Sequence, residues 1–193
     1  MKYLQALGIS ALSLVILTAC EQKTQSSVGK IPAASAPVTA SASTPAVQAT
    51  AQKLTSNNGK ISIETTGQFT DQLAQANELI SDIPSEQLTL LQNDAANDVL
   101  IYAADLGAAK SDAPTYLNQL SDAIKADAKL QQANVSSING NQLAYQFSEV
   151  VGDNTINQAC QAIHAQNIYT VCAISSTRSS ADLASTIEKI SVQ

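Results

Sequence analysis

The chain has 193 residues, three cysteines and a formal net charge of −6, a length that suggests one domain with appended segments. Every acidic residue except Glu21 lies from Leu54 onward, and an acidic domain is repelled by phosphate backbones and anionic lipid head groups. The charge therefore argues against nucleic-acid binding. It leaves cations or basic proteins as charged partners, beside the simpler explanation of a surface kept acidic for solubility.

The N-terminal residues have the pattern of a bacterial lipoprotein signal peptide. Lys2 precedes an apolar run over residues 4–17, which is too short to span a bilayer comfortably. Thr18 and Ala19 supply the small side chains that a lipoprotein peptidase needs before the bond it cuts, and Cys20 supplies the thiol after it. We expect residues 1–19 to be removed and Cys20 to carry a diacylglyceride and a further acyl chain such as palmitate, which together anchor the protein in a membrane.

The segment after the cysteine predicts where the protein lies and how it is attached. Glu21, rather than aspartate, follows Cys20, which resembles the pattern sorted to the outer membrane in enterobacteria-like lipoproteins; the inner membrane is the alternative. Residues 20–53 are rich in Ala, Ser, Thr and Pro and hold no aromatic residue, so they cannot bury enough surface to fold. We expect a disordered tether, facing the periplasm, that carries a single globular domain over residues 54–193.

The first elements of this domain follow from hydrophobic periodicity. Ile61 and Ile63 alternate with polar residues after the turn signal at residues 57–59, which predicts a first strand. Apolar residues then recur at helical spacing over residues 70–84 and predict a helix. Residues 87–92 and 98–105 predict a hairpin, and the second of its strands should be central because it is almost entirely apolar.

The second half is predicted to be a helix followed by a meander. Asp112 and Pro114 are typical of a helix start, and an apolar stripe follows them. Four antiparallel strands are then predicted by two runs, residues 134–138 and 143–147, that Asn139-Gly140 joins, by a turn at residues 152–154 and by a bend near Gln166. The last helix should begin at Ser180 and place three residues on one side, namely Leu183, Ile187 and Ile190.

This order of elements predicts the fold class. Strand, helix, two strands, helix, four strands and helix together indicate an α+β domain. We expect an antiparallel-rich sheet flanked by helices, that is, an αβα sandwich.

The remaining cysteines predict a disulfide. With Cys20 taken by lipid, Cys160 and Cys172 form an even pair in an exported domain, which is the condition for a disulfide. Each lies six residues from Gln166, so a hairpin centred there places them on neighbouring antiparallel strands, opposite each other. We expect a structural bridge rather than a redox site, which would favour closer spacing.

The lipoprotein box, the low-complexity tether and two segments of the meander, residues 142–147 and 168–172, resemble the DcrB-like envelope lipoproteins, whose fold is that of the Mog/PsbP-like group. The likeness covers roughly residues 58–192. It implies a central antiparallel sheet of about six strands between helices. It also implies a binding module that docks onto a larger assembly, and it supplies no catalytic residues.

Candidate catalytic and metal-binding residues are few. His164 is the only histidine, and a triad would need it beside an acid and a nucleophile such as Asp153 and Ser148 or Ser175. No nucleophile elbow surrounds either serine, so we expect His164 to be a side chain at the end of a hairpin. Zinc would require three or four ligands, and we predict no catalytic, cofactor-binding or metal-binding residues.

Two further groups have a structural and a functional interpretation. Asp94, Asn97 and Asp98 form an acidic turn that resembles a calcium loop, but it lacks the alternate ligand positions, the central glycine and the terminal glutamate. Asx-turn hydrogen bonding explains it without a metal. Four tyrosines could belong to a binding face, but we expect them in the core because bulky residues are scarce; they are Tyr102, Tyr116, Tyr145 and Tyr169.

The sequence therefore predicts the location of the protein better than its activity. We expect a lipid-anchored periplasmic lipoprotein that acts, without catalysis, as a binding or scaffolding module for another envelope protein of unknown identity. The alternatives are a small-ligand-binding lipoprotein or hydrolase, and an inhibitor or immunity-like protein whose acidic surface neutralises a basic target.

Overall fold

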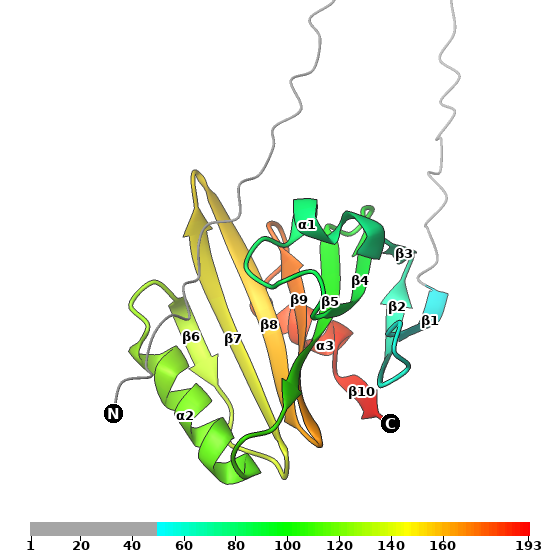
Figure 1. Cartoon of the computed structure of the whole chain (residues 1–193). Coiled ribbons are helices and arrows are strands. Elements are labelled where there is room, and N and C mark those ends of the chain that lie inside the picture. Colours follow the sequence, from blue (N-terminus) through cyan, green and yellow to red (C-terminus); the bar gives the residue numbers. More distant parts are fainter. Residues whose placement is uncertain (1–49) are drawn as a thin grey trace, which may run out of the picture. The chain divides into compact units, whose positions relative to one another are not determined.

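The main element of the fold is a seven-stranded antiparallel sheet (Figure 1). The computed structural model describes residues 50–193, so the expected signal peptide, Cys20 and the tether up to residue 49 lie outside the described residues. The strand order is β3-β4-β5-β9-β8-β7-β6. The strands are β3 (Thr70–Asp71), β4 (Leu88–Asp94), β5 (Val99–Ala108), β6 (Gln131–Val135), β7 (Gln142–Val151), β8 (Asn154–His164) and β9 (Asn167–Ser175).

The predicted hairpins of this sheet are confirmed. Strands β4 and β5 pair directly, and β7, β8 and β9 form a continuous meander with antiparallel registers. The predicted turns contain Gly140 and Gly152, whose φ angles of 58° and 61° lie in the left-handed region that glycine adopts without strain. Strand β6 begins three residues before its predicted start and pairs with β7. Local turn chemistry therefore predicts where the strands of the meander turn back.

A smaller sheet lies against one face of the main sheet. Its order is β1-β2-β10, with β1 at Thr50–Thr55, β2 at Ile61–Gly67 and β10 at Lys189–Val192. The predicted first strand is β2, whereas β1 and β10 were not predicted. Because β1 begins at Thr50, the four residues 50–53 that we assigned to the tether belong to a strand. Residues from the small sheet, from helix α3 (Ser180–Thr186) and from one face of the main sheet form a common apolar core.

The last predicted helix is shorter than expected. Leu183 and Ile187 are buried as predicted, with 0% and 1% of their surface exposed, but the helix stops at Thr186. The hydroxyls of Ser185 and Thr186 donate to carbonyl oxygens three residues earlier, which ends the helix. Ile190 then lies in β10, opposite Ile63 of β2. Residues 189–192 therefore pair with the free edge of β2 as a strand, although the spacing of their apolar residues predicts a helix.

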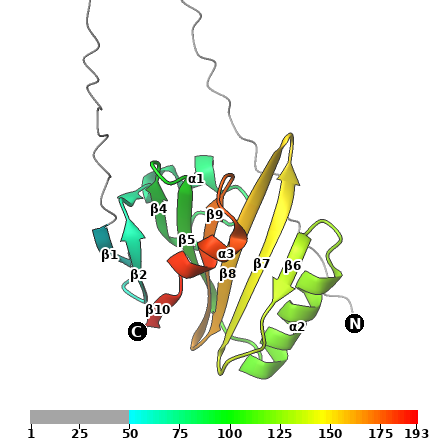
Figure 2. The ribbon, with the colours of Figure 1, turned by 180° about the vertical axis from the view of Figure 1, so that it is seen from behind.

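The opposite face of the main sheet carries the other helices, as a comparison of Figures 1 and 2 shows. Helix α2 (Ala113–Ala126) begins as predicted, since the Asp112 carboxylate accepts a hydrogen bond from the backbone N–H of Thr115. Leu117 of this helix is fully buried against Leu143 of β7. The sequence therefore locates both the start and the apolar face of α2.

The prediction of a long helix over residues 70–84 is wrong. Thr70 and Asp71 pair with β4 as the short strand β3, and the N–H of Gln72 donates to the carbonyl of Leu91, also in β4. Only a 3₁₀ turn, η1 (Leu73–Gln75), and a single helical turn, α1 (Ala76–Leu79), follow. Hydrogen bonding to the edge of the sheet replaces most of the helix, and residues 80–87 run on as an irregular segment to β4.

The antiparallel sheet that we predicted is present, but the domain is mainly β rather than a full αβα sandwich. The main sheet has seven strands instead of about six, and a second antiparallel sheet covers much of one face where we expected helices. The helices are few and, apart from α2, short. The domain differs from an αβα sandwich because β1 and β10 both pair with β2. These three strands cover apolar surface that helices cover in a sandwich.

Candidate functional site

The disulfide lies in the middle of the main sheet. Cys160 of β8 and Cys172 of β9 are direct cross-strand partners, with Cα atoms 4.1 Å apart, and they form the predicted bridge. Tyr102 of β5 is the partner of Cys172, and Tyr145 of β7 is the partner of Cys160. The bridge is therefore the centre of a row that crosses four strands on the face that carries α1 and α2. Both cysteines are buried, in keeping with a structural role.

The tyrosines that we expected in the core are mostly there. Tyr102 and Tyr169 are buried, with 9% and 4% of their surface exposed. Tyr145 and Tyr116 are half-buried and pack against apolar clusters, and the ring of Tyr145 stacks on that of Phe147. Of these four, Tyr102 acquires a further role below because its hydroxyl reaches a surface hollow.

The structure does not bring the imagined triad together. His164 lies at one end of β8, where its Nε2 donates to the backbone carbonyl of Ser111 at 2.7 Å. Ser148 and Ser175 both lie opposite Asn157, seven residues away along β8, which corresponds to roughly 23 Å of strand. Asp153 lies in the turn that precedes β8. His164 therefore holds the loop before α2 at the end of a strand, as we expected for a hairpin-end side chain.

Asp94 satisfies backbone and side-chain donors of this chain. It is 1% exposed, and its carboxylate accepts hydrogen bonds from the N–H of Gln68 and from the N–H and side-chain amide of Asn97. Burial raises the pKa of this carboxyl, but these hydrogen bonds outweigh it and the net pKa is lowered. Asp94 thus fastens the β4–β5 turn to the segment after β2.

Asp98 performs a similar task at the other end of that turn. Its Oδ2 atom accepts from the N–H and hydroxyl of both Ser176 and Thr177 and from the hydroxyl of Ser175, at 2.8–3.0 Å. Burial opposes ionisation, but these donors, Ser176 first, hold the pKa of the carboxyl below its usual value. The turn is explained by such hydrogen bonds. Within residues 50–193, no three His, Cys, Asp or Glu side chains are grouped to hold a metal ion.

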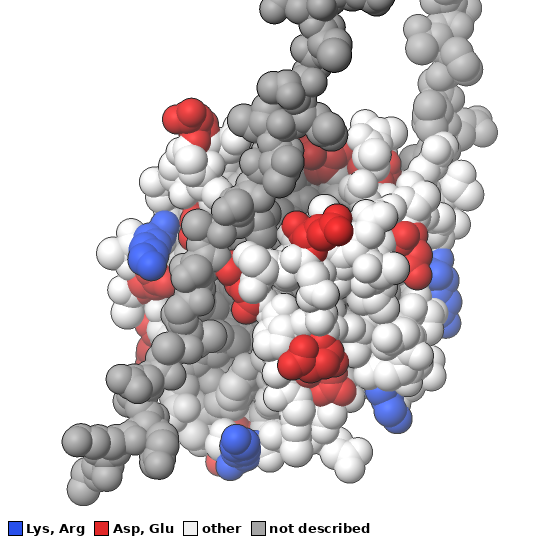
Figure 3. All heavy atoms as spheres, turned by 45° about the horizontal axis from the view of Figure 1, so that its top comes forward, with Lys and Arg blue, Asp and Glu red and all other residues white. Residues whose placement is uncertain are grey.

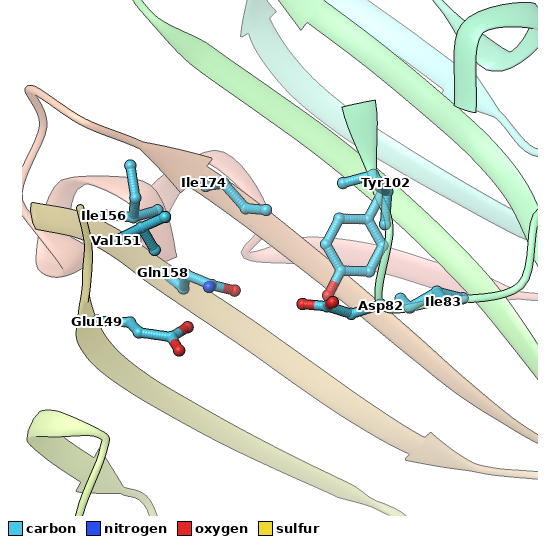
Figure 4. A pocket seen from close by; sticks show the side chains of 9 residues that line it. Asp82, Ile83, Tyr102, Glu149, Val151, Ile156, Gln158 and Ile174 are labelled. Carbon is cyan, nitrogen blue, oxygen red and sulfur yellow. The ribbon is translucent and has the colours of Figure 1, made fainter. Parts of the chain in front are cut away.

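A small hollow lies on the same sheet face as the cysteine row (Figure 4). Its volume is about 60 Å³, and it lies between residues 80–83 and strands β5, β9, β8 and β7. Aliphatic side chains form much of the wall, and four polar side chains open into it, namely Asp82, Tyr102, Glu149 and Gln158. Figure 4 shows the Tyr102 hydroxyl beside the Asp82 carboxylate, with Glu149 and Gln158 pointing into the same space from the opposite side. We call this the Glu149 pocket.

The electrostatics of the Glu149 pocket are unbalanced. Burial, then the charge of Asp82, raises the pKa of the Glu149 carboxyl; Lys129 partly opposes this shift and Asp127 adds to it. Burial also raises the pKa of Tyr102 strongly, with the charges of Tyr145 and Asp82 as smaller causes. No ion pair with Asp82 or Glu149 forms among the described residues. The pocket therefore combines aliphatic walls with excess negative charge, which suits a cationic group.

A second, wider hollow lies at the small sheet. Its volume is about 480 Å³, and strands β1, β2 and β10 and the end of α3 line it. Lys53 and Lys189 both lie opposite Glu64 in the strand registers, so its lining has mixed charge. Thr65 also lines it. Its Oγ1 atom is the one buried side-chain oxygen or nitrogen, among the described residues, without a hydrogen-bond partner. His164 lines neither of these two hollows.

Comparisons with known proteins identify no family. No protein-family model and no curated protein matches this sequence.

None of the helices in residues 50–193 is long and apolar enough to cross a membrane. On the face seen in Figure 3, acidic side chains form several separate groups and the few basic ones lie near the outline.

The sequence did not predict the Glu149 pocket. Its polar side chains come from residues 82, 102, 149 and 158, far apart in the chain, and only the strand order brings them together. A weak signal was present in β7, where Glu149 follows Phe147 in the alternation that predicts inward-facing residues. A charged residue at an inward position is the kind of exception that marks a site.

Proposed function

We propose that this protein is a lipid-anchored module of the cell envelope that binds another envelope protein without catalysis. Cys20 is the proposed lipid attachment site, and the proposed location is the periplasmic side of the outer membrane, with the inner membrane as alternative. The Cys160–Cys172 bridge supports an exported domain, because disulfides persist in oxidising compartments. A proposed tether of some 30 residues gives the domain a reach of roughly 30 Å from the membrane as a flexible coil.

The observation that carries this proposal is the Glu149 pocket. An open hollow on a sheet face, with carboxylates that form no ion pair and an aliphatic wall, is the kind of surface to which a partner docks. Its volume of about 60 Å³ is well below the roughly 300–1,000 Å³ typical of pockets that enclose a small ligand. The pocket therefore favours a protruding group of a larger partner over an enclosed substrate.

Two alternatives are each supported by one observation. The excess of carboxylates at the Glu149 pocket also suits an inhibitor or immunity-like protein for a basic target. The wider hollow beside β10 has the volume of a small-ligand site, which supports a ligand-binding lipoprotein. For a hydrolase that uses His164, Ser148 and Ser175 lie at the wrong end of the strands.

We also propose that the domain is a variant of the DcrB-like fold. The support is an antiparallel main sheet with α1 and α2 on one face and α3 on the other, which is the layer order of an αβα arrangement. The second sheet is where the chain departs from that arrangement. The proposal would fail if an experimentally determined structure of a DcrB-like protein had a different order of strands in its main sheet.

In-cell crosslinking followed by purification tests the proposed function. A tagged copy is crosslinked in living cells, and co-purified proteins are identified by mass spectrometry. The matched control carries the same residues 1–49 on an unrelated domain, so that proteins near the membrane are subtracted. One dominant envelope protein above this control supports the binding module. If no protein is enriched above this control, the binding-module proposal is contradicted and the small-ligand alternative is favoured. Native mass spectrometry then tests that alternative.

A further inference from the structure

Tyr102 provides the first step toward the ligand of the Glu149 pocket. Its side chain is more than nine-tenths buried, and it has no hydrogen-bond partner in the part of the chain that the structure describes. Among the described residues the one fully buried side-chain oxygen or nitrogen without a partner is that of Thr65, so the Tyr102 hydroxyl is open to the hollow rather than sealed in the core. It faces the hollow beside Asp82 (Figure 4), where a bound group can supply the hydrogen bond that the described part of the chain does not.

The carboxylates provide the second step. Glu149 comes from β7 and Asp82 from the segment before β4, and both line the hollow. Each raises the energy of the other's charge, because Asp82 is one cause of the raised Glu149 pKa. The charge of Lys129 lowers the pKa of Glu149, but by too little to cancel the upward shift. A cation between the two carboxylates would stabilise both charges at once.

The apolar wall provides the third step. Ile80, Ile83, Ile156 and Ile174 line the hollow beside the polar groups. Arginine and lysine have an aliphatic stem that packs on such a wall while the charged end reaches its partners. A volume of about 60 Å³ holds a few water-sized groups, at roughly 10–15 Å³ each, which matches the end of one side chain and not a whole residue.

We propose that the Glu149 pocket binds the guanidinium or ammonium end of an arginine or lysine side chain that the partner protein presents. The cation lies between Glu149 and Asp82, the Tyr102 hydroxyl and the Gln158 amide oxygen accept hydrogen bonds from it, and the stem lies on the isoleucines. Arginine fits better than lysine, because its planar end carries five donors for several acceptors at once. This inference rests on the proposed function, since the partner presents the side chain.

A titration of the full mature chain, purified in detergent, tests the chemistry of the pocket. The probes are n-butylguanidinium and n-butylammonium, with n-butylurea as a neutral molecule of the same shape as the first. Isoleucine methyl groups are labelled for NMR, so that four methyl signals report on the pocket and Ile61 and Ile63 in the other core serve as controls. We expect n-butylguanidinium to bind with a Kd of about 1–10 mM, typical of so small a ligand, and n-butylurea about tenfold more weakly.

Variants assign the effect to named groups. Glu149→Gln and Asp82→Asn should each weaken n-butylguanidinium binding about tenfold, and Tyr102→Phe about threefold. Glu188→Gln, in the wider hollow, should leave the Kd unchanged. Unchanged methyl signals outside the pocket show that each variant is folded. Equal binding of the urea and the guanidinium, or signal changes away from the pocket isoleucines, would overturn the inference.

Crosslinking of the same variants in cells separates the inference from the proposed function. A partner that the wild-type chain and Glu188→Gln capture, and that Glu149→Gln captures at least about fivefold less, supports both. A partner captured equally by the wild type and by Glu149→Gln shows that the module binds elsewhere; the inference then fails and the proposed function stands. If no partner is captured, the proposed function fails, and with it the claim that a partner fills the pocket, whatever the titration gives.

Discussion

Removal of the Cys160–Cys172 bridge should destabilise the domain by about 4 kcal/mol. In the chain-entropy model, a disulfide that closes a loop of about 13 residues contributes roughly 3 kcal/mol at 25 °C. Replacement of both cysteines by alanine also removes two sulfur atoms from a layer in which the cysteines are only 3% and 1% exposed, and the remaining voids cost roughly another 1 kcal/mol. At about 4 °C per kcal/mol for a domain of this size, the melting temperature should fall by about 15 °C.

Urea unfolding followed by circular dichroism measures this loss. The double variant Cys160→Ala/Cys172→Ala is compared with the wild-type chain, with and without a thiol reductant. Reductant should lower the wild-type free energy of unfolding by the roughly 3 kcal/mol of the bridge, because the cysteines become accessible in the unfolded chain, and should leave the variant unchanged. A loss below about 1 kcal/mol, or a difference that persists in full under reductant, would refute the reasoning.

Three further predictions concern a carboxylate, a glycine and the proposed anchor. Asp98→Ala should lower the free energy of unfolding by about 2 kcal/mol near neutral pH. Because the folded pKa of Asp98 is lowered, this contribution should be complete above pH of about 4 and shrink as the pH falls below it; urea unfolding at about pH 7 and about pH 3 checks this, and an equal loss at both would contradict it. Gly67→Ala should destabilise by about 1–3 kcal/mol, because a Cβ there would lie 2.6 Å from Asp94 Oδ2 and from the ring of Phe69; a thermal melt measures the loss, and an unchanged melting temperature would contradict it. Cys20→Ala should release the protein from membranes in cell fractionation, and a variant that stayed lipidated would disprove the anchor.

Local signals account for the parts of the fold that the sequence predicted. The Asn139-Gly140 turn, the symmetric spacing of Cys160 and Cys172 about Gln166, and the Asp112 cap of α2 each act within a few residues. Their geometry therefore does not depend on distant parts of the chain, and the structure confirms them.

Long-range pairing accounts for the parts that it did not predict. Strand β10 exists because β2, more than 120 residues earlier in the chain, offers it a free edge, and β3 exists because Thr70 and Asp71 lie beside β4. The spacing of apolar residues within a segment does not show that a free strand edge, on β2 or on β4, lies beside it in the fold. The same holds for the Glu149 pocket, whose lining residues are collected by the strand order rather than by any local motif.

The position of β1 has a mechanical consequence. The chain leaves Thr50 toward the proposed anchor, and Thr50 pairs with Gly67, at the end of the β1–β2 ladder farthest from the connecting turn. A pull from the membrane would load that pair first and separate the ladder one residue pair at a time. Leu54 is the only residue of β1 that is buried, so the strand detaches at little cost, lengthening the tether by about 20 Å for six residues. Force at the membrane would therefore separate β1 from the small sheet before it disrupts the disulfide-braced main sheet and its Glu149 pocket.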